Sequence, residues 1–139
     1  MRKIAIASGT RADWGLLSGP ARALQERDDC EVFVLATNMH LSRCYGHTID
    51  EIRADGIRNI IEVPMATDGD TPLDAIMAMA ECQIAMGECL TLLRPDLIVI
   101  LGDRFEMLAT ATAALMLRIP IVHIAGGELS EGALADSIR

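Results

Sequence analysis

Hydrophobic positions along the chain form short apolar runs that alternate with longer stretches of helical period. Five short runs predict β-strands, namely Lys3–Ser8, Val32–Thr37, Arg58–Val63, Leu97–Leu101 and Ile121–Ile124. The first, fourth and fifth runs are apolar nearly throughout, as expected of strands covered by helices on both faces. Four stretches between them predict helices, namely Asp13–Arg27, Thr48–Ala54, Thr71–Arg94 and Phe105–Leu117. Strands and helices that alternate in this order predict a parallel sheet with right-handed crossovers.

A chain of 139 residues is long enough for one hydrophobic core and too short for two. We find no internal repeat, low-complexity tract or interdomain linker. We therefore expect residues 1–139 to form a single Rossmann-like domain, a parallel sheet flanked by helices.

The predicted helix Thr71–Arg94 has two apolar faces, whereas a helix that covers one side of a sheet needs one. The first face contains Leu73, Ile76, Met77, Ala80, Ile84 and Gly87, and the second contains Met79, Cys82, Met86, Leu90 and Leu93. We expect the first face to cover the sheet. The second face then predicts a homodimer through helix 71–94, or else contact with a neighbouring helix of the same domain.

Charged residues, glycines and hydroxyls gather in the loops that follow three of the predicted strands. If the first three strands run outward in one direction and the last two in the other, the strand order reverses between strands one and four. Ligands of open parallel sheets bind at the carboxyl ends of the strands at such a reversal. The three loops read Ser8-Gly9-Thr10-Arg11-Ala12-Asp13, Gly102-Asp103-Arg104-Phe105-Glu106 and Ala125-Gly126-Gly127-Glu128. We expect the functional site there.

Each candidate residue in these loops also has a plain structural interpretation. Gly9 and Arg11 could hold an anion, because backbone N–H groups face outward where a helix begins. The alternative is a tight turn with Asp13 as the helix N-cap. Asp103 could exchange protons or simply cap the next helix. His123 lies inside an apolar strand, where a histidine is more often part of the core.

Several classes of protein are disfavoured by what the chain lacks. The loop after the first strand is not Gly-x-Gly-x-x-Gly, and no Gly-Lys-Ser/Thr is present, which argues against dinucleotide oxidoreductases and P-loop enzymes. The net charge of −8 disfavours nucleic acid and anionic membranes as partners. The apolar stretch Met107–Leu117 ends at Arg118, too early to span a bilayer.

The start of the chain and its cysteines predict a cytoplasmic protein. Met1-Arg2-Lys3 leads into an apolar run that is too short for a signal peptide. The four cysteines include no Cys-x-x-Cys pair, so we expect reduced thiols and no metal site. We expect no cofactor.

Taken together, the loop motifs resemble the hydrolysing UDP-N-acetylglucosamine 2-epimerases. The resemblance rests on motifs that occur in the order of that family over the whole chain: Ser8 to Asp13, Ala36-Thr37-Asn38-Met39-His40-Leu41, Pro95-Asp96-Leu97, Leu101 to Glu106, Ile119-Pro120-Ile121, His123-Ile124, Gly126-Gly127-Glu128 and Asp136-Ser137-Ile138-Arg139. Arg11-Ala12-Asp13 is similar to the hydrolysing branch rather than the non-hydrolysing one, which usually has Arg-Pro-Glu.

This resemblance implies the N-terminal half of a two-domain, GT-B-like architecture with the active site in the cleft between the domains. It implies that this chain lacks the end of the first domain and the whole second, nucleotide-binding domain. The implied substrate is a UDP-sugar, and the isolated chain is expected to be inactive.

The resemblance also implies roles for individual residues. Asp103 matches an acidic catalytic position, and Arg11, Asp13 and Arg139 match positions that line the sugar–phosphate site. The family often has Glu or His at position 125 and Asp at position 135, where this chain has alanine, so we predict that Glu128 and Asp136 substitute as catalytic acids. The remaining predicted binding residues are Gly9, Arg104, His123 and Ser137.

The implied reaction removes UDP from C1 and a proton from C2, and water then adds to the glycal-like intermediate. The product is N-acetylmannosamine or an analogue, for sialic or nonulosonic acid synthesis. Two other functions stay open. One is a non-catalytic or excised domain that folds or dimerises without turnover, and the other is a glycosyltransferase of the same architecture.

Overall fold

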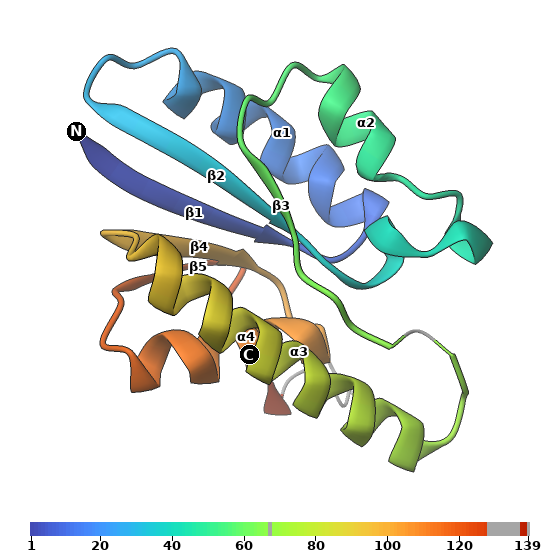
Figure 1. Cartoon of the computed structure of the whole chain (residues 1–139). Helices are drawn as coiled ribbons and strands as arrows, with labels where there is room; N and C mark the ends of the chain where they lie inside the picture. Colours follow the sequence, from blue (N-terminus) through green and yellow to red (C-terminus); the bar gives the residue numbers. More distant parts are fainter. Residues whose placement is uncertain (67, 128–136, 139) are drawn as a thin grey trace.

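The computed structural model describes residues 1–66, 68–127 and 137–138 as a five-stranded, entirely parallel sheet flanked by helices (Figure 1). The strands are β1 (Arg2–Ser8), β2 (Cys30–Ala36), β3 (Ile60–Glu62), β4 (Leu97–Leu101) and β5 (Ile121–Ile124). Their order is β3-β2-β1-β4-β5. The predicted strands, the parallel sheet and the reversal between the first and fourth strands are confirmed.

Helices cover both faces of the sheet. Figure 1 shows α1 (Arg11–Gln25) and α2 (Ile49–Ala54) on one side, and α3 (Pro72–Leu93) and α4 (Phe105–Met116) on the other. Two short 3-10 helices, η1 (Asn38–Leu41) and η2 (Arg43–Tyr45), follow β2 and were not predicted. Single turns of this kind have no hydrophobic period, so the sequence pattern carries no signal for them.

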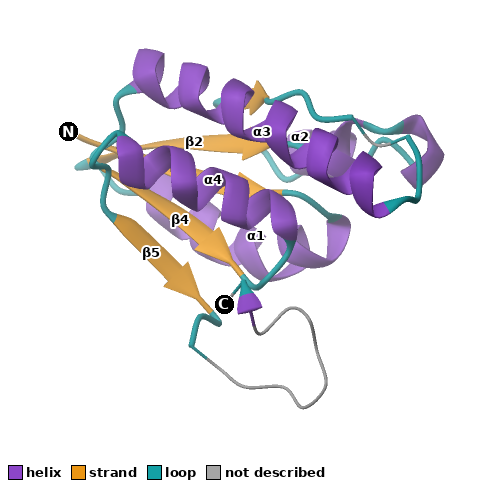
Figure 2. Cartoon of the chain, turned by 90° about the horizontal axis from the view of Figure 1, so that it is seen from below, coloured by secondary structure: helices purple, strands orange, loops and turns teal. Residues whose placement is uncertain are grey.

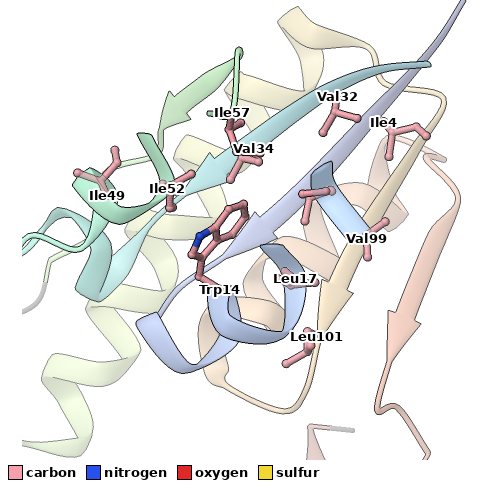
Figure 3. Close-up of a cluster of buried hydrophobic side chains, with 13 residues drawn as sticks. Ile4, Trp14, Leu17, Val32, Val34, Ile49, Ile52, Ile57, Val99 and Leu101 are labelled. Atoms are coloured by element: carbon pink, nitrogen blue, oxygen red, sulfur yellow. The ribbon is translucent and has the colours of Figure 1, made fainter. Parts of the chain in front are cut away.

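Alternate residues of β1 serve the two faces. Ile4 and Ile6 pack with Trp14 and Leu17 of α1, as Figure 3 shows for the labelled residues of this cluster. Ala5 and Ala7 belong to the opposite cluster, where residues of α3 and α4 pack on the sheet. Fully burying a large apolar side chain stabilises the fold by about 1.5–3 kcal/mol. The two clusters therefore hold all three layers together.

Capping residues define where the helices begin. α3 begins within one residue of the predicted start, with Thr71 as its N-cap, Pro72 in the first turn and a capping box formed with Asp74. The interpretation of Asp13 as the N-cap of α1 is wrong. Thr10 is the N-cap, and its hydroxyl accepts a 3.2 Å hydrogen bond from the N–H of Asp13. Asp13 therefore lies within the first turn, where its carboxyl can turn back toward the loop.

The faces of α3 are the reverse of those expected. Met86 and Leu90, expected at a subunit interface, are 0% and 1% exposed and pack with Ala5 and Ala7 of β1. The face expected to cover the sheet is open, since Leu73, Ile76, Met77 and Ile84 are 58–65% exposed. Both faces are apolar, so composition could not choose between them. On the buried face, the long side chains of Met86 and Leu90 pack against the small alanines Ala5 and Ala7 of β1.

α3 is also the one described helix that is long and apolar enough to cross a membrane, with a mean hydropathy of 1.4 over 18 residues. Core helices of globular α/β domains can meet the same criterion. In this fold α3 packs beside α4 over the sheet through Met86, Leu90 and their neighbours. The helix thus belongs to one of the two helical layers.

Candidate functional site

The loops after β1, β2 and β4 meet at the carboxyl edge of the sheet, where the strand order reverses. The N–H of Thr37 donates to the carbonyl of Ser8 at 3.0 Å, and the N–H of Met39 donates to the carbonyl of Gly9 at 3.0 Å. These bonds extend the β1–β2 ladder beyond the strands and bring η1 beside the β1 loop. β4 and β5 lie side by side on the other flank of β1 (Figure 2).

Two neighbouring pockets open in this region. The arginine pocket, of ≈ 310 Å³, is lined by Thr10, Arg11, Ala12, Met39, Tyr45, Thr48 and Arg104. The aspartate pocket, of ≈ 220 Å³, includes Asn38, Asp68, Asp70, Asp74 and Phe105 in its lining. Met39, Tyr45 and Arg104 line both pockets. Arg104 therefore lies between them.

Two guanidinium groups give the arginine pocket its charge. Arg11 is 75% exposed and pairs with Glu51 of α2 at 3.1 Å, so it costs little to redirect toward a ligand. The side chain of Arg104 is less exposed, at 33%. Its Nε donates a hydrogen bond to Oε1 of Glu106 at 2.6 Å. Two arginines at one concave site favour binding of a phosphate or diphosphate group.

Glu106, which was not among the predicted site residues, joins the three loops. Its side chain is fully buried, and Oε1 also accepts a 3.0 Å hydrogen bond from Nδ2 of Asn38. A Cβ on Gly9 would overlap Oε1, so glycine is required there for space. The sequence places Glu106 one turn after Asp103, but nothing in the pattern shows that this acid is buried.

Gly9 therefore contacts a carboxylate of the protein itself. Asp13 also faces this loop, and burial is the main reason that its pKa is raised. The charge of Glu106 raises it further, while the Thr10 hydroxyl, Arg104 and the Gly9 N–H act in the opposite direction. Two acids of the protein, Asp13 and Glu106, thus lie at the loop that precedes α1.

Asp103 and His123 lie on the β4 side of the same edge. Asp103 is half-buried, and it is not the cap of α4, whose N-cap is Arg104. Nε2 of His123 lies 2.6 Å from the carbonyl oxygen of Gly102. Because a carbonyl only accepts, Nε2 carries the proton, and the imidazole fixes the β4 loop against β5.

The remaining predicted site residues lie at the end of the chain. Glu128, Asp136 and Arg139 fall outside the described residues. Ser137 is described and exposed. The predicted roles of these four residues stay predictions.

His40 connects β1 to α2 inside the core. It is fully buried, with Nε2 2.8 Å from Oγ of Ser8 and Nδ1 2.8 Å from Oγ1 of Thr48. Burial lowers its pKa to about 4, so the ring is neutral at pH 7. Over the described ranges, no three His, Cys, Asp or Glu side chains lie together in a way that would hold a metal ion.

The parallel sheet, with its reversal of strand order and the loops that meet there, defines a Rossmann-like domain. The chain belongs to the UDP-N-acetylglucosamine 2-epimerase family, whose model matches residues 22–139. The resemblance inferred from the loop motifs is thereby confirmed.

Curated relatives match the chain over nearly all of its length. It is 39% identical over 138 residues to the hydrolysing GDP/UDP-N,N'-diacetylbacillosamine 2-epimerase of Campylobacter jejuni, covering 99% of this chain and 36% of that protein. It is 38% identical to the hydrolysing UDP-N,N'-diacetylbacillosamine 2-epimerase of Legionella pneumophila. This match covers 100% of this chain and 37% of that protein. The chain thus spans about a third of the length of these relatives.

Solved structures share the fold. The UDP-GlcNAc 2-epimerase of Neisseria meningitidis bound to UDP-GlcNAc superposes with a TM-score of 0.77 at 19% identity, covering 94% of this chain and 34% of that one. The calicheamicin glycosyltransferase CalG4 superposes with a TM-score of 0.58 at 18% identity. This match covers 99% of this chain and 36% of that one. Likeness at this level of identity concerns the fold, which is the Rossmann-like part of a GT-B-like architecture.

Proposed function

We propose that this chain is the first domain of a hydrolysing UDP-sugar 2-epimerase. The observation that carries the proposal is the arginine pocket at the reversal of strand order, in a chain of this family. The substrate is a UDP-linked 2-acetamido sugar, either UDP-N-acetylglucosamine or a 2,4-diacetamido analogue. The names of the Campylobacter and Legionella relatives favour the diacetamido sugar.

The reaction divides between cations and acids. Arg11 and Arg104 stabilise the diphosphate as the C1–O bond breaks and UDP leaves with the bonding electrons. A base removes the C2 proton, which gives a C1–C2 double bond, and water then adds across it with protonation on the other face of C2. We assign proton exchange at the sugar to Asp103, with Glu128 and Asp136 as the further acids.

The remaining two thirds of such an enzyme would supply the other wall of the cleft. We propose that a second domain holds the uridine, as the resemblance implies, and that turnover requires both domains. Closing a cleft excludes water and assembles both sides of the site. The pathway supplied would be sialic or nonulosonic acid synthesis, in the cytoplasm.

An activity assay tests this proposal. The 139-residue chain and a protein extending it by a second domain would each be incubated with UDP-N-acetylglucosamine and with UDP-N,N'-diacetylbacillosamine. Release of UDP and formation of the 2-epimeric free sugar would be followed by NMR. We expect turnover by the extended protein alone. Turnover by the short chain at a comparable rate, or by neither protein on either sugar, would refute the assignment.

We also propose that the open face of α3 binds a second copy of the chain. Four large side chains on this face, Leu73, Ile76, Met77 and Ile84, are at least 58% exposed. Leu115 of the adjacent helix α4 is 64% exposed. Soluble monomers rarely expose so continuous an apolar surface, and two-fold pairing covers it on both copies at once.

A further inference from the structure

The side chain of Glu106 is held in place from three parts of the chain. It is fully buried and belongs to the first turn of α4, where the helix dipole favours an acid. Oε1 fills the space in which a Cβ on Gly9 would lie, and it accepts a 3.0 Å hydrogen bond from Nδ2 of Asn38 in η1. A displacement of this carboxyl would therefore disturb the β1 loop, η1 and α4 together.

Arg104 is attached to this fixed carboxyl by one edge of its guanidinium. Its backbone is set by α4, because Arg104 is the N-cap and its carbonyl accepts from the N–H of Met107 at 2.9 Å. Its Nε donates to Oε1 of Glu106 at 2.6 Å. Four of the five N–H donors of a guanidinium belong to the two terminal nitrogens. The contact through Nε therefore directs these four donors toward the pockets that Arg104 lines.

Packing alone gives little reason for an acid at position 106. Among the described residues, Oε2 of Glu106 is a buried oxygen with no hydrogen-bond partner, which lowers the stability of the fold. Apolar side chains of similar size often replace a buried ion pair with no loss of stability. A carboxyl whose side-chain bonds run through one oxygen, to Asn38 and Arg104, therefore favours a role outside the core.

We propose that Glu106 is a positioning residue, which binds Nε of Arg104 so that the two terminal nitrogens form a fixed fork at the boundary between the arginine pocket and the aspartate pocket. The inference rests on the proposed function, in which this boundary receives a diphosphate. A guanidinium fork matches two phosphate oxygens. A fork that is ordered before the ligand arrives loses less side-chain entropy on binding.

Arg11 provides the contrast within the same pocket. It pairs with Glu51 through the same atoms, Nε to Oε1, at 3.1 Å. Both of these side chains are exposed, whereas Glu106 is fully buried. An exposed ion pair restrains its partners weakly. The arginine pocket thus has one ordered guanidinium and one that can follow the ligand.

Charge and position predict opposite effects when Glu106 is replaced. If the carboxylate acted through its charge alone, its removal would leave a more positive site and anions would bind more tightly. If it acts by holding Arg104, the loss of its oxygen frees the guanidinium and anions bind more weakly. The direction of the change in affinity therefore decides between the two roles.

Calorimetry with inorganic pyrophosphate on the 139-residue chain measures that direction. Glu106→Met removes the acceptor oxygen and should weaken binding about two- to tenfold, the cost of ordering one long side chain. Glu106→Gln keeps an acceptor oxygen and should bind at least as tightly as the unmodified chain. The matched control is Glu51→Met, which should keep or raise the affinity. Unchanged or tighter binding in Glu106→Met, or equal weakening in Glu106→Gln, would overturn the proposal.

Nitrogen-15 relaxation of the arginine Nε–H groups tests the positioning without a ligand. In the unmodified chain we expect Arg104 to be ordered on the picosecond to nanosecond timescale and Arg11 to be mobile. Glu106→Met should make Arg104 as mobile as Arg11. Equal mobility of the two arginines in the unmodified chain would overturn the proposal, and that comparison requires no variant to fold.

The two measurements separate this inference from the proposed function. An ordered Arg104 in a chain that does not bind pyrophosphate would count against the diphosphate site and leave the positioning by Glu106 standing. A mobile Arg104 in a chain that binds pyrophosphate would overturn the positioning and leave the diphosphate site standing.

Discussion

Gly9 shows how one residue can be required for space alone. Its backbone has no left-handed conformation, yet a methyl group at this position would overlap the carboxylate of Glu106. That carboxylate is held in turn by Arg104 and Asn38, so it cannot move without breaking their hydrogen bonds. The close approach of β1 to α4 thus depends on the missing side chain.

Gly9→Ala should therefore destabilise the chain by about 1–3 kcal/mol, the usual cost of overpacking. The matched control is Gly15→Ala on the exposed side of α1, where nothing lies within 4 Å of the added carbon. That change should stabilise by up to about 1 kcal/mol, because alanine is the better helix former. Urea unfolding of both variants measures the difference. Equal free energies of unfolding would mean that Glu106 has room to withdraw.

Asp103→Asn should be the most damaging single change in an enzyme that contains this domain. The substitution preserves size and removes the charge, and the loss of a proton-transfer group costs on the order of 10²–10⁴ in rate. The measurement is kcat for UDP release, with thermal unfolding as the check on folding. A rate within tenfold of the unmodified enzyme would leave Asp103 with a structural role.

His40 should make the stability of the chain depend on pH. Its pKa in the folded chain, about 4, lies below the ordinary value of 6.5, so the unfolded chain binds the proton first as the pH falls. The contribution of the neutral ring is complete above pH 6.5 and is lost between there and pH 4, by about 3 kcal/mol at most. His40→Gln should lack this dependence. Urea unfolding of both proteins from pH 7 to pH 4 checks it, and parallel curves would contradict it.

At the scale of elements, apolar spacing predicted the strands and α-helices of the described residues within a few positions. Thr71 and Pro72 act locally at the start of α3, and Arg94 acts locally at its end, so residues near these positions in the sequence are enough to define the helix. Which apolar face of α3 is buried depends on its packing against the sheet, and a helical wheel does not contain that information. The burial of Glu106 depends likewise on three loops that meet only after folding.

The two faces of α3 should respond differently to substitution. Leu90→Ala removes a fully buried side chain and should cost about 2–5 kcal/mol. Ile84 lies on the open face and is 65% exposed. Ile84→Ala should therefore change the free energy of unfolding of a single chain by about 0.5 kcal/mol or less. Chemical unfolding at low protein concentration compares them. A larger loss for Ile84 than for Leu90 would show that the helix is turned the other way.

At the scale of the whole molecule, the open face of α3 bears on assembly. The double substitution Ile76→Glu with Ile84→Glu would place like charges at the centre of a two-fold contact. We therefore expect it to convert a dimer into a monomer. Leu16→Glu is the control, because Leu16 is 67% exposed on α1, across the sheet. Light scattering at micromolar concentration measures the mass. A monomeric unmodified chain, or a dimer that survives both substitutions, would exclude this interface.

The order of the strands also determines when the sheet can be completed during translation. β1 lies at the centre of the sheet, and its junction with β4 joins Lys3 to Asp96, 93 positions apart, through bonds of 2.7 and 2.8 Å. A ribosome adds about 5–20 residues each second, so one edge of β1 waits roughly 5–20 s for its partner. During that interval the nascent chain holds a half-built sheet of β1, β2 and β3 with an open apolar edge. Chaperones that bind emerging polypeptides should therefore engage this chain before residue 101 has been translated, and release it soon after.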